Sequence, residues 1–287
     1  MNSLLRLRRM TSADLSFADS VRALAGWNQT PADWQRLLAH EPAGCFLAEW
    51  NGAAAGTATT TVYGQDLAWI GMVLVHPDFR RRGVGKALLE HCIEYLRDRG
   101  VRCLKLDATP LGKKVYDTLG FKDEWTLTRW VRPSGPLPAS EPEPGIRSWL
   151  EEDARSIDRL DTAAFGVSRQ RLVTTLARKS PHALVLQSAP GPITGYGLGR
   201  GGTRAFYLGP VVARSADAGL RLVEALLART GGEPVFWDIP DPNTPAAAWA
   251  ARHGFSRQRS LTRMYLGANT TPGNPQHQFA LAGPEKG

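Results

Sequence analysis

The sequence predicts an α+β chain built from two similar domains, and three observations support this fold class. Residues 67–75 (LAWIGMVLV) form a continuous apolar run with the length of a buried strand. A helical pattern follows at residues 83–99, where apolar side chains recur every three or four positions up to Gly100. The strand-then-helix order of the first half begins again after residue 145. With 287 residues and 43% hydrophobic content, the chain is long enough for two cores.

The other elements of the first half follow in order along the chain. Residues 4–9 predict a first strand, and residues 13–40 predict two short helices, the second begun by Thr30 and Pro31. The remaining predicted elements are a hairpin at 45–63 that turns at Asn51-Gly52, a strand at 102–108, a helix at 111–121 that ends at Gly120, and a last strand at 125–131.

A basic, glycine-containing turn lies between the buried strand and the helix that follows it. Residues 80–85 (RRRGVG) combine positive charge, backbone without side chains and a helix N-terminus, which together favour an anion such as phosphate. A solvated basic turn is the alternative. The turn has neither the pattern of a P-loop nor that of a dinucleotide fold.

The pattern R-x-x-G-x-G, preceded by VLVHPDF and followed by KALLE, closely resembles the acetyl-CoA pyrophosphate loop of the GNAT superfamily of N-acetyltransferases. The resemblance covers residues 4–132 and implies a mixed, mostly antiparallel twisted sheet flanked by helices. It also implies acetyl-CoA as co-substrate, with the pantetheine arm along the central strand and the pyrophosphate on backbone N–H groups of the turn. The residues expected to bind acetyl-CoA are Val73, Leu74, Val75, Arg80, Arg81, Arg82, Gly83, Val84, Gly85, Lys86 and Thr109.

The resemblance implies one catalytic side chain but leaves the general base open. Tyr116 lies four residues before a Gly-Phe pair, as in many family members, and would protonate the leaving thiolate. The alternative for Tyr116 is packing on the sheet. The two positions where the family commonly has glutamate fall at Trp69 and Leu104, which cannot accept a proton. The candidates that remain are Asp107, Glu49 and His76, or a chain of water molecules.

The expected acceptor is the primary amine of a small molecule, which attacks the thioester directly. In this family the first two helices and their loops usually determine the acceptor, and Trp27, Trp34 and Trp69 could form an aromatic wall there. Core packing is an equal alternative for these tryptophans. A non-catalytic acyl-CoA sensor and a protein amine acetyltransferase are the alternative functions.

The second half resembles a degenerate copy of the first. Residues 119–130 (LGFKDEWTLTRW) match residues 253–264 (HGFSRQRSLTRM) at an offset of 134, which carries Gly83 onto Asp217. An aspartate repels phosphate, so we expect one coenzyme A per chain. Two unrelated α+β domains are the alternative. The predicted division is a catalytic domain at 1–132, a Pro-rich linker at 133–145, a degenerate domain at 146–267 and a disordered tail at 268–287. Trp237, Asp238 and Arg263 are expected to face a cleft between the domains.

Composition limits the other classes of protein. The net charge of +8 permits a nucleic-acid partner, but the basic residues are dispersed and no nucleic-acid motif is present. No apolar run reaches membrane-spanning length, and the six histidines show no metal-ligand spacing. Three cysteines without paired spacing predict reduced core residues of a cytoplasmic protein. We therefore expect no metal, no nucleic acid and no membrane partner, and a monomer or homodimer.

Overall fold

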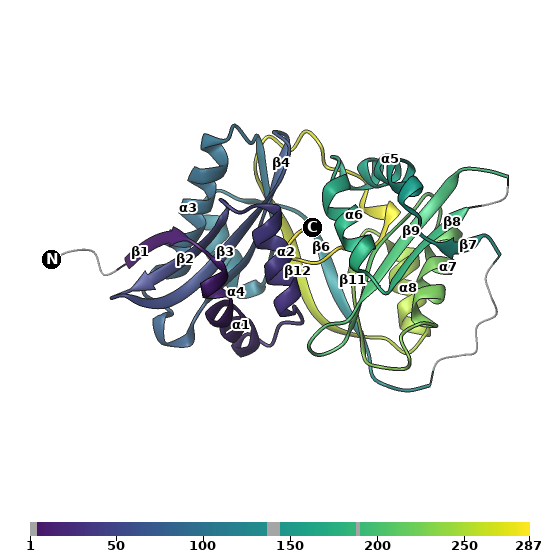
Figure 1. Cartoon of the computed structure of the whole chain (residues 1–287), viewed down its shortest axis with the longest axis horizontal. Coiled ribbons are helices and arrows are strands. Elements are labelled where there is room, and N and C mark those ends of the chain that lie inside the picture. Colours follow the sequence, from purple (N-terminus) through teal and green to yellow (C-terminus); the bar gives the residue numbers. More distant parts are fainter. Residues whose placement is uncertain (1–4, 137–143, 188–189) are drawn as a thin grey trace. The chain divides into compact units, whose positions relative to one another are not determined.

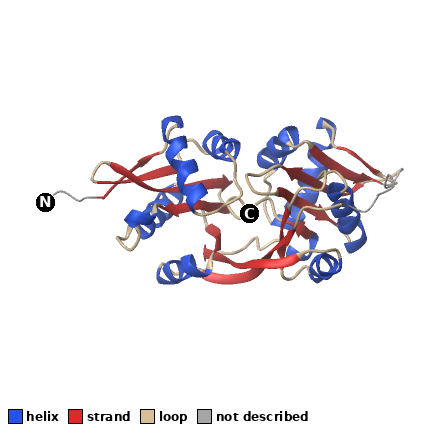
Figure 2. Ribbon diagram, turned by 90° about the horizontal axis from the view of Figure 1, so that it is seen from below, coloured by secondary structure: helices blue, strands red, loops and turns tan. Residues whose placement is uncertain are grey.

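The computed structural model describes residues 5–136, 144–187 and 190–287, which form two compact units (Figure 1). The first unit comprises residues 1–123, 264–270 and 284–287, and the second comprises residues 124–263 and 271–283. In each unit helices pack on the faces of a mixed sheet, and Figure 2 shows these helices beside the strands that they cover. The predicted α+β class, with a mostly antiparallel sheet in each half, is confirmed.

The sheet of the first unit combines antiparallel and parallel pairs of strands. Its order is β1-β2-β3-β4-β5, followed by β12, of which residues 264–267 belong to this unit. Strands β4 and β5 run parallel, while the pairs β1–β2, β2–β3 and β3–β4 are antiparallel. The strand bounds are β1 Leu5–Arg9, β2 Cys45–Trp50, β3 Ala53–Tyr63, β4 Leu67–Val75, β5 Cys103–Ala108 and β12 Ser256–Gly267.

Two cores lie on the two faces of this sheet. Helix α3 (Val84–Asp98) covers one face with Leu88, Leu89 and Cys92, all of them fully buried. Helices α1 (Leu15–Leu24) and α2 (Pro31–His40) cover the other face. Helix α2 begins as predicted, because Thr30 and Asp33 form a reciprocal capping box around its first turn. Helix α4 (Pro110–Thr118) follows β5.

The second unit repeats this arrangement. Its strand order is β12-β6-β11-β10-β9-β8-β7, and β10 runs parallel to β11 as β4 does to β5. Buried positions on α3 and α7 correspond at the offset of 134, for example Leu88 with Leu222 and Cys92 with Leu226. The elements are β6 Lys122–Arg132, β7 Ile146–Ser148, α5 Ala154–Phe165, α6 Gln170–Lys179, β8 His182–Gln187, β9 Ile193–Arg200, β10 Phe206–Ala213, α7 Ala216–Leu227, β11 Val235–Pro240, α8 Thr244–Arg252 and β13 Gln278–Ala280.

The structure differs from the expected division in two respects. Residues 124–132 of β6 belong to the second unit and residues 264–270 to the first, so each unit takes chain from the other half of the sequence. Of the predicted linker, residues 137–143 lie outside the described residues. The expectation of disorder beyond residue 267 is wrong, because β13 pairs with β10 and Phe279, Leu281 and Ala282 are buried. Apolar burial stabilises this segment despite its polar, glycine-rich beginning.

None of the helices in the described ranges is long and apolar enough to cross a membrane. The three cysteines, Cys45, Cys92 and Cys103, are buried thiols without disulfide bonds, as predicted. Burial raises the pKa of Cys45 to about 12, so this thiol stays protonated near neutral pH.

Candidate functional site

Strands β4 and β5 part after a short contact and leave an edge of β4 open. Ala68 pairs with Leu104 and Trp69 with Lys105, although β4 continues to Val75. A bulge follows the point of separation, where the register to β3 shifts and Met72 has a φ of 49°. The Thr57 hydroxyl donates a hydrogen bond of 2.9 Å to the Met72 carbonyl and holds the bulge. Among the described residues, the β4 backbone beyond Trp69 has no strand partner on its β5 side, and we call this unpaired edge the first slot.

The predicted arm-binding residues line this slot with their backbone. Val73 and Val75 are half-buried on the α3 face of the sheet, and Leu74 is buried on the opposite face. Leu74 pairs with Thr57 and Val75 with Gly56, both on β3. Their side chains therefore belong to the two cores, and their use in binding a pantetheine arm stays a prediction.

The turn after β4 exposes the N-terminus of α3. Arg81 and Gly83 have left-handed φ values of 59° and 81°, and Gly83 is the N-cap residue without any side chain to cap the helix. The first amides of α3, at Val84, Gly85 and Lys86, are therefore left to other acceptors. A Cβ placed at Gly83 would meet nothing within 4 Å. This geometry suits an anion that approaches the backbone closely.

The basic side chains of the turn have different roles. Arg80 Nε donates to the Val75 carbonyl at 3.3 Å and ties the turn to the end of β4. The Arg82 guanidinium lies 5.4 Å from the Trp50 ring centre, a cation–π contact. Lys86 Nζ lies 3.6 Å from the Glu90 carboxylate on the same helix, while Arg81 is exposed. Arg80 and Arg82 thus shape the turn, and positive charge surrounds the exposed amides.

Helix α4 positions both of the other predicted side chains. Tyr116 packs on the α3-side core, and its hydroxyl lies 3.1 Å from the position that a Cβ of Gly112 would occupy. Burial, with a smaller contribution from Cys92, raises the pKa of Tyr116 to about 12. The Thr109 hydroxyl accepts a hydrogen bond of 3.1 Å from the Gly112 amide and caps α4. Thr109 therefore has a structural role whether or not it also contacts acetyl-CoA.

The structure places one of the three candidates for the general base in an ion pair. The Glu49 carboxylate accepts a hydrogen bond of 2.6 Å from Arg8, which also binds Asp14, so Glu49 is part of an ion-pair cluster. His76 caps a short 3-10 helix at Pro77–Phe79, where its Nδ1 lies 3.4 Å from the Asp78 amide nitrogen. Asp107 is half-buried on β5. Trp69 and Leu104, where the resemblance would place glutamate, are both buried.

Of the two roles considered for the three tryptophans, an aromatic wall or core packing, the structure favours packing. Trp34 is fully buried in the core under α1 and α2, and Trp27 packs against that same core. Trp69 is also fully buried, and its indole N–H donates to the Pro284 carbonyl at 2.9 Å. Packing is thus the main role of Trp34, whereas Trp69 contacts a segment of chain 215 positions later.

The three residues predicted to face a cleft are instead part of the second unit's interior. Asp238 is fully buried and forms a two-bond ion pair with Arg129 at 2.7 and 2.6 Å, and this ion pair lowers the Asp238 pKa. Trp237 is fully buried, and Arg263 is 2% exposed with its guanidinium 4.1 Å from the Trp125 ring centre. Buried charge requires such partners, so these residues belong to the packed interior of the second unit.

The corresponding slot of the second unit is filled by the chain itself. Strand β13 pairs with β10 at Val211 and Val212, beyond the residues of β10 that pair with β11. Trp237 Nε1 donates to the Phe279 carbonyl at 2.8 Å, and Asn243 Nδ2 donates to the Gln278 carbonyl at 3.0 Å. A Cβ at Gly219 would overlap the Phe279 ring. The backbone of residues 278–280 therefore pairs with the part of β10 that corresponds to the unpaired edge of β4.

The helix N-terminus of the second unit is also closed. Ser215 caps α7 by accepting a hydrogen bond of 3.2 Å from the Ala218 amide. Asp217 lies in the first turn and places a carboxylate at the positive end of the helix. In the second unit, Asp217 thus stands at the position that corresponds to Gly83, and the side chains of Ser215 and Asp217 provide the acceptor and the negative charge at the N-terminus of α7.

The sequence-based interpretation missed the segment that fills this slot. The sequence signal for this segment is the short apolar run FALA at 279–282, flanked by polar residues, which the prediction of a disordered tail did not take into account.

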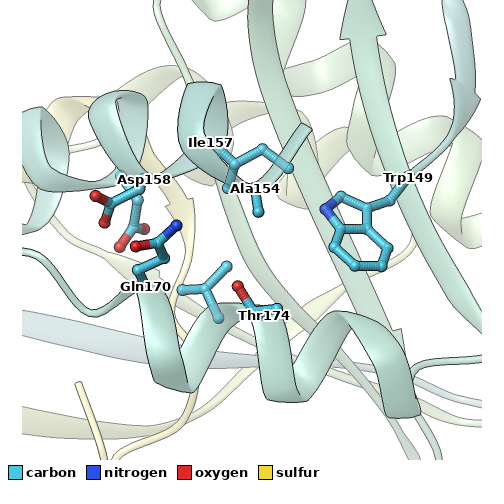
Figure 3. Close-up of a pocket in the computed structure, with 8 residues that line it drawn as sticks. Trp149, Ala154, Ile157, Asp158, Gln170 and Thr174 are labelled. Atoms are coloured by element: carbon cyan, nitrogen blue, oxygen red, sulfur yellow. The ribbon is translucent and has the colours of Figure 1, made fainter. Parts of the chain in front are cut away.

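A hollow in the second unit is drawn in Figure 3, where Trp149 and Ile157 lie near Thr174. It lies between α5 and α6, and its carboxylates are engaged, Asp161 with Arg169 at 2.8 Å and Asp158 with Ser168 at 2.6 Å. It is therefore a packing gap between two helices.

Sequence profiles identify both halves of the chain. The profile of the Acetyltransferase (GNAT) family matches residues 10–121, and that of an Acetyltransferase (GNAT) domain matches residues 157–280. The uncharacterized N-acetyltransferase YitH of Bacillus subtilis is 27% identical over 178 residues, which are 62% of this chain and 62% of YitH. The [Ribosomal protein bS18]-alanine N-acetyltransferase of Escherichia coli is 39% identical over 31% of this chain and 61% of its own length. The chain thus spans less than two thirds of these two curated relatives.

Solved structures share the fold along nearly the whole chain. A protein of Pyrococcus horikoshii matches with a TM-score of 0.82 at 24% identity, and the match covers 100% of this chain and 97% of the other protein's chain. A tandem GNAT protein from the clavulanic acid biosynthesis pathway has a TM-score of 0.67 at 18% identity, with coverage of 92% and 98%. At these identities the likeness shows the fold, and the two profile matches show the family. The chain belongs to the GNAT family of acetyltransferases and consists of two GNAT units in tandem.

Proposed function

We propose that the chain is an acetyl-CoA-dependent N-acetyltransferase that acetylates the primary amine of a small molecule in its first unit. The observation that carries this proposal is the contrast between the two units. In the first, an open slot along β4 leads to an uncapped helix N-terminus at Gly83. In the second, β13 fills the slot and Ser215 caps the helix. One coenzyme A per chain follows from this contrast.

The first unit offers coenzyme A two kinds of backbone contact. The amides of residues 81–86 would hold the pyrophosphate, since the α3 N-terminus presents unpaired N–H groups and a positive dipole end. The open edge of Val73, Leu74 and Val75 would pair with the amide groups of the pantetheine arm. With the pyrophosphate at the turn, the arm runs back along β4, so the acetyl group ends near the point where β4 and β5 meet.

The proposed reaction is a direct attack of the amine on the thioester. The neutral amine nitrogen forms a bond to the carbonyl carbon, the carbon–sulfur bond breaks, and the ammonium proton leaves to water. Tyr116 would donate a hydrogen bond to the leaving thiolate. With a pKa of about 12 its phenol is protonated at neutral pH. Complete transfer to a thiolate of pKa near 8.5 would cost about 5 kcal/mol, so hydrogen bonding in the transition state is the favoured role.

A protein amine is the second candidate acceptor, and one observation favours it. The first unit already holds a stretch of peptide, because Tyr63 and Trp69 donate hydrogen bonds to the carbonyls of Lys286 and Pro284. The acetyltransferase of Escherichia coli that matches the first half is named for an alanine of a ribosomal protein. A small molecule remains the proposal, because this peptide-binding face is already occupied by the chain's own residues.

Thiol release from acetyl-CoA, measured with a mixture of small primary amines, tests the proposed function. Turnover above the rate without amine, together with calorimetric binding of one acetyl-CoA per chain, is expected. Binding with stoichiometry near one but without turnover of any amine would favour the sensor alternative. Turnover of peptides alone would favour the protein acceptor, and failure to bind acetyl-CoA would refute the proposed function.

A further inference from the structure

Residues Pro284–Gly287 are folded into the first unit, close to the open slot. The Trp69 indole donates a hydrogen bond of 2.9 Å to the Pro284 carbonyl, and the Tyr63 hydroxyl donates one of 2.7 Å to the Lys286 carbonyl. Both donors lie in the sheet of this unit, on β4 and β3. In Figure 1 the mark C stands beside α2. The segment is thus held by its backbone, whatever its side chains do.

The segment covers the closed end of the slot. Trp69 is the last residue of β4 that pairs with β5, and Gly71 is the second residue after it. A Cβ at Gly71 would clash with the Glu285 carbonyl oxygen and lie 2.8 Å from its Cα. Glycine at position 71 therefore makes room for Glu285. Since the acetyl group of a bound arm ends near this point, Glu285 lies where an acceptor would approach.

The two side chains of this segment form a buried ion pair. Glu285 is 2% exposed and Lys286 is 3% exposed, and the Lys286 ammonium contacts the Glu285 carboxylate. The other carboxylate oxygen accepts a hydrogen bond of 2.7 Å from Gln29, in the loop between α1 and α2. A buried carboxylate is costly without a cation and hydrogen-bond donors around it. The site is therefore built to hold a primary ammonium group.

We propose that Glu285 binds the ammonium group of the acceptor and that the Lys286 ammonium occupies this place until an acceptor replaces it. The acceptor class that fits is a small primary alkylamine, whose charged end matches that of a lysine side chain. This inference rests on the proposed function and adds the group that recognises the amine. Glu285 supplies the carboxylate that the family's two usual glutamate positions, Trp69 and Leu104, lack.

Chemical rescue tests the proposal directly. Lys286→Ala removes three carbons and the ammonium group, which together correspond to n-propylammonium. We expect this variant to bind n-propylammonium saturably in calorimetry and to form N-propylacetamide from acetyl-CoA. Lys286→Met fills the same space without charge, and Lys286→Ala/Glu285→Gln removes the carboxylate's charge but keeps its shape. Lys286→Met should not bind n-propylammonium, because its side chain fills the space. The double variant should bind it at least about tenfold more weakly, the usual effect of a hydrogen bond to a charged group.

Equal binding of n-propylammonium by Lys286→Ala and the double variant would overturn the proposal, as would absence of binding to a folded Lys286→Ala. If Lys286→Ala does not fold, Glu285→Gln alone decides. We expect its KM for n-propylamine to rise about tenfold or more while acetyl-CoA affinity stays unchanged. An unchanged KM, or no N-propylacetamide from the unaltered protein, would overturn the inference and leave the proposed function open to other amines. Loss of acetyl-CoA binding in the unaltered protein would instead refute the proposed function.

Discussion

Gly83→Asp should weaken coenzyme A binding severely, and the structure allows the size of the effect to be worked out. The new carboxylate would stand at the N-cap of α3, next to amides that no side chain now caps. A charge about 4 Å from one phosphate charge costs ~1 kcal/mol in water and ~4 kcal/mol at an effective dielectric constant of 20. The carboxylate would also accept hydrogen bonds from the amides that the pyrophosphate needs. A loss of ~2–4 kcal/mol corresponds to a Kd increased about 30- to 1,000-fold.

Gly83→Ala is the matched control, because it separates backbone strain from charge. Its φ of 81° disfavours any side chain and should destabilise the fold by ~1–2 kcal/mol. The position is otherwise open, with no atom within 4 Å of a Cβ, so the affinity for coenzyme A should change little. Asp217→Ala, at the corresponding place in the second unit, should leave both affinity and stoichiometry unchanged.

Titration calorimetry with coenzyme A measures all three variants under the same salt concentration. Gly83→Asp binding within about threefold of the unaltered protein would refute the assignment of the pyrophosphate to this helix N-terminus. Two equivalent sites per chain, or a loss of binding in Asp217→Ala alone, would show that the second unit binds coenzyme A despite its filled slot.

Three further predictions concern catalysis, pH and stability. Tyr116→Phe should lower kcat roughly ten- to a thousand-fold with little change in the KM for acetyl-CoA, since its hydroxyl acts in the transition state; equal rates would leave Tyr116 a packing residue. The activity should rise with pH along the pKa of the acceptor amine and fall only near 12, because the raised pKa of Tyr116 keeps its donor form present below that value. Replacing Asp107, Glu49 or His76 singly should leave the rising limb in place, and its loss in one variant would identify that residue as the base. Phe279→Ala should destabilise the chain by ~3–5 kcal/mol in denaturant unfolding without creating a second coenzyme A site, because Ser215 and Asp217 remain.

The elements that depend on a local residue pattern could be predicted from the sequence. The buried strand at 67–75, the following helix and the glycine turn were all predictable. The apolar periodicity and the glycines needed at positive φ are features of residues that are close together in the sequence. The repeat at an offset of 134 was also visible, since buried helix positions keep their spacing in both halves.

The features that escaped prediction all depend on residues far apart in the chain. Gln29 donates a hydrogen bond to Glu285, which lies 256 positions later in the sequence, and no local pattern predicts that contact. The tail after residue 267 has turn-forming composition, yet its backbone groups find partners in Trp237 and Asn243. Tryptophans at 27, 34 and 69 looked suited to a ligand wall, but apolar area alone cannot distinguish a pocket lining from a core.

The division of the chain between the two units has a consequence for its synthesis. The core of the first unit includes Met264, which is fully buried in the same cluster as the apolar residues of α3. Leu266 packs against this cluster. The ribosome must therefore add roughly 140 residues after Asp123 before this core can close. At about 5–20 residues per second that interval lasts ~7–30 s. Many multidomain proteins complete their N-terminal domain first during translation, whereas here the nascent first unit stays incompletely packed until residues 264–270 have been made.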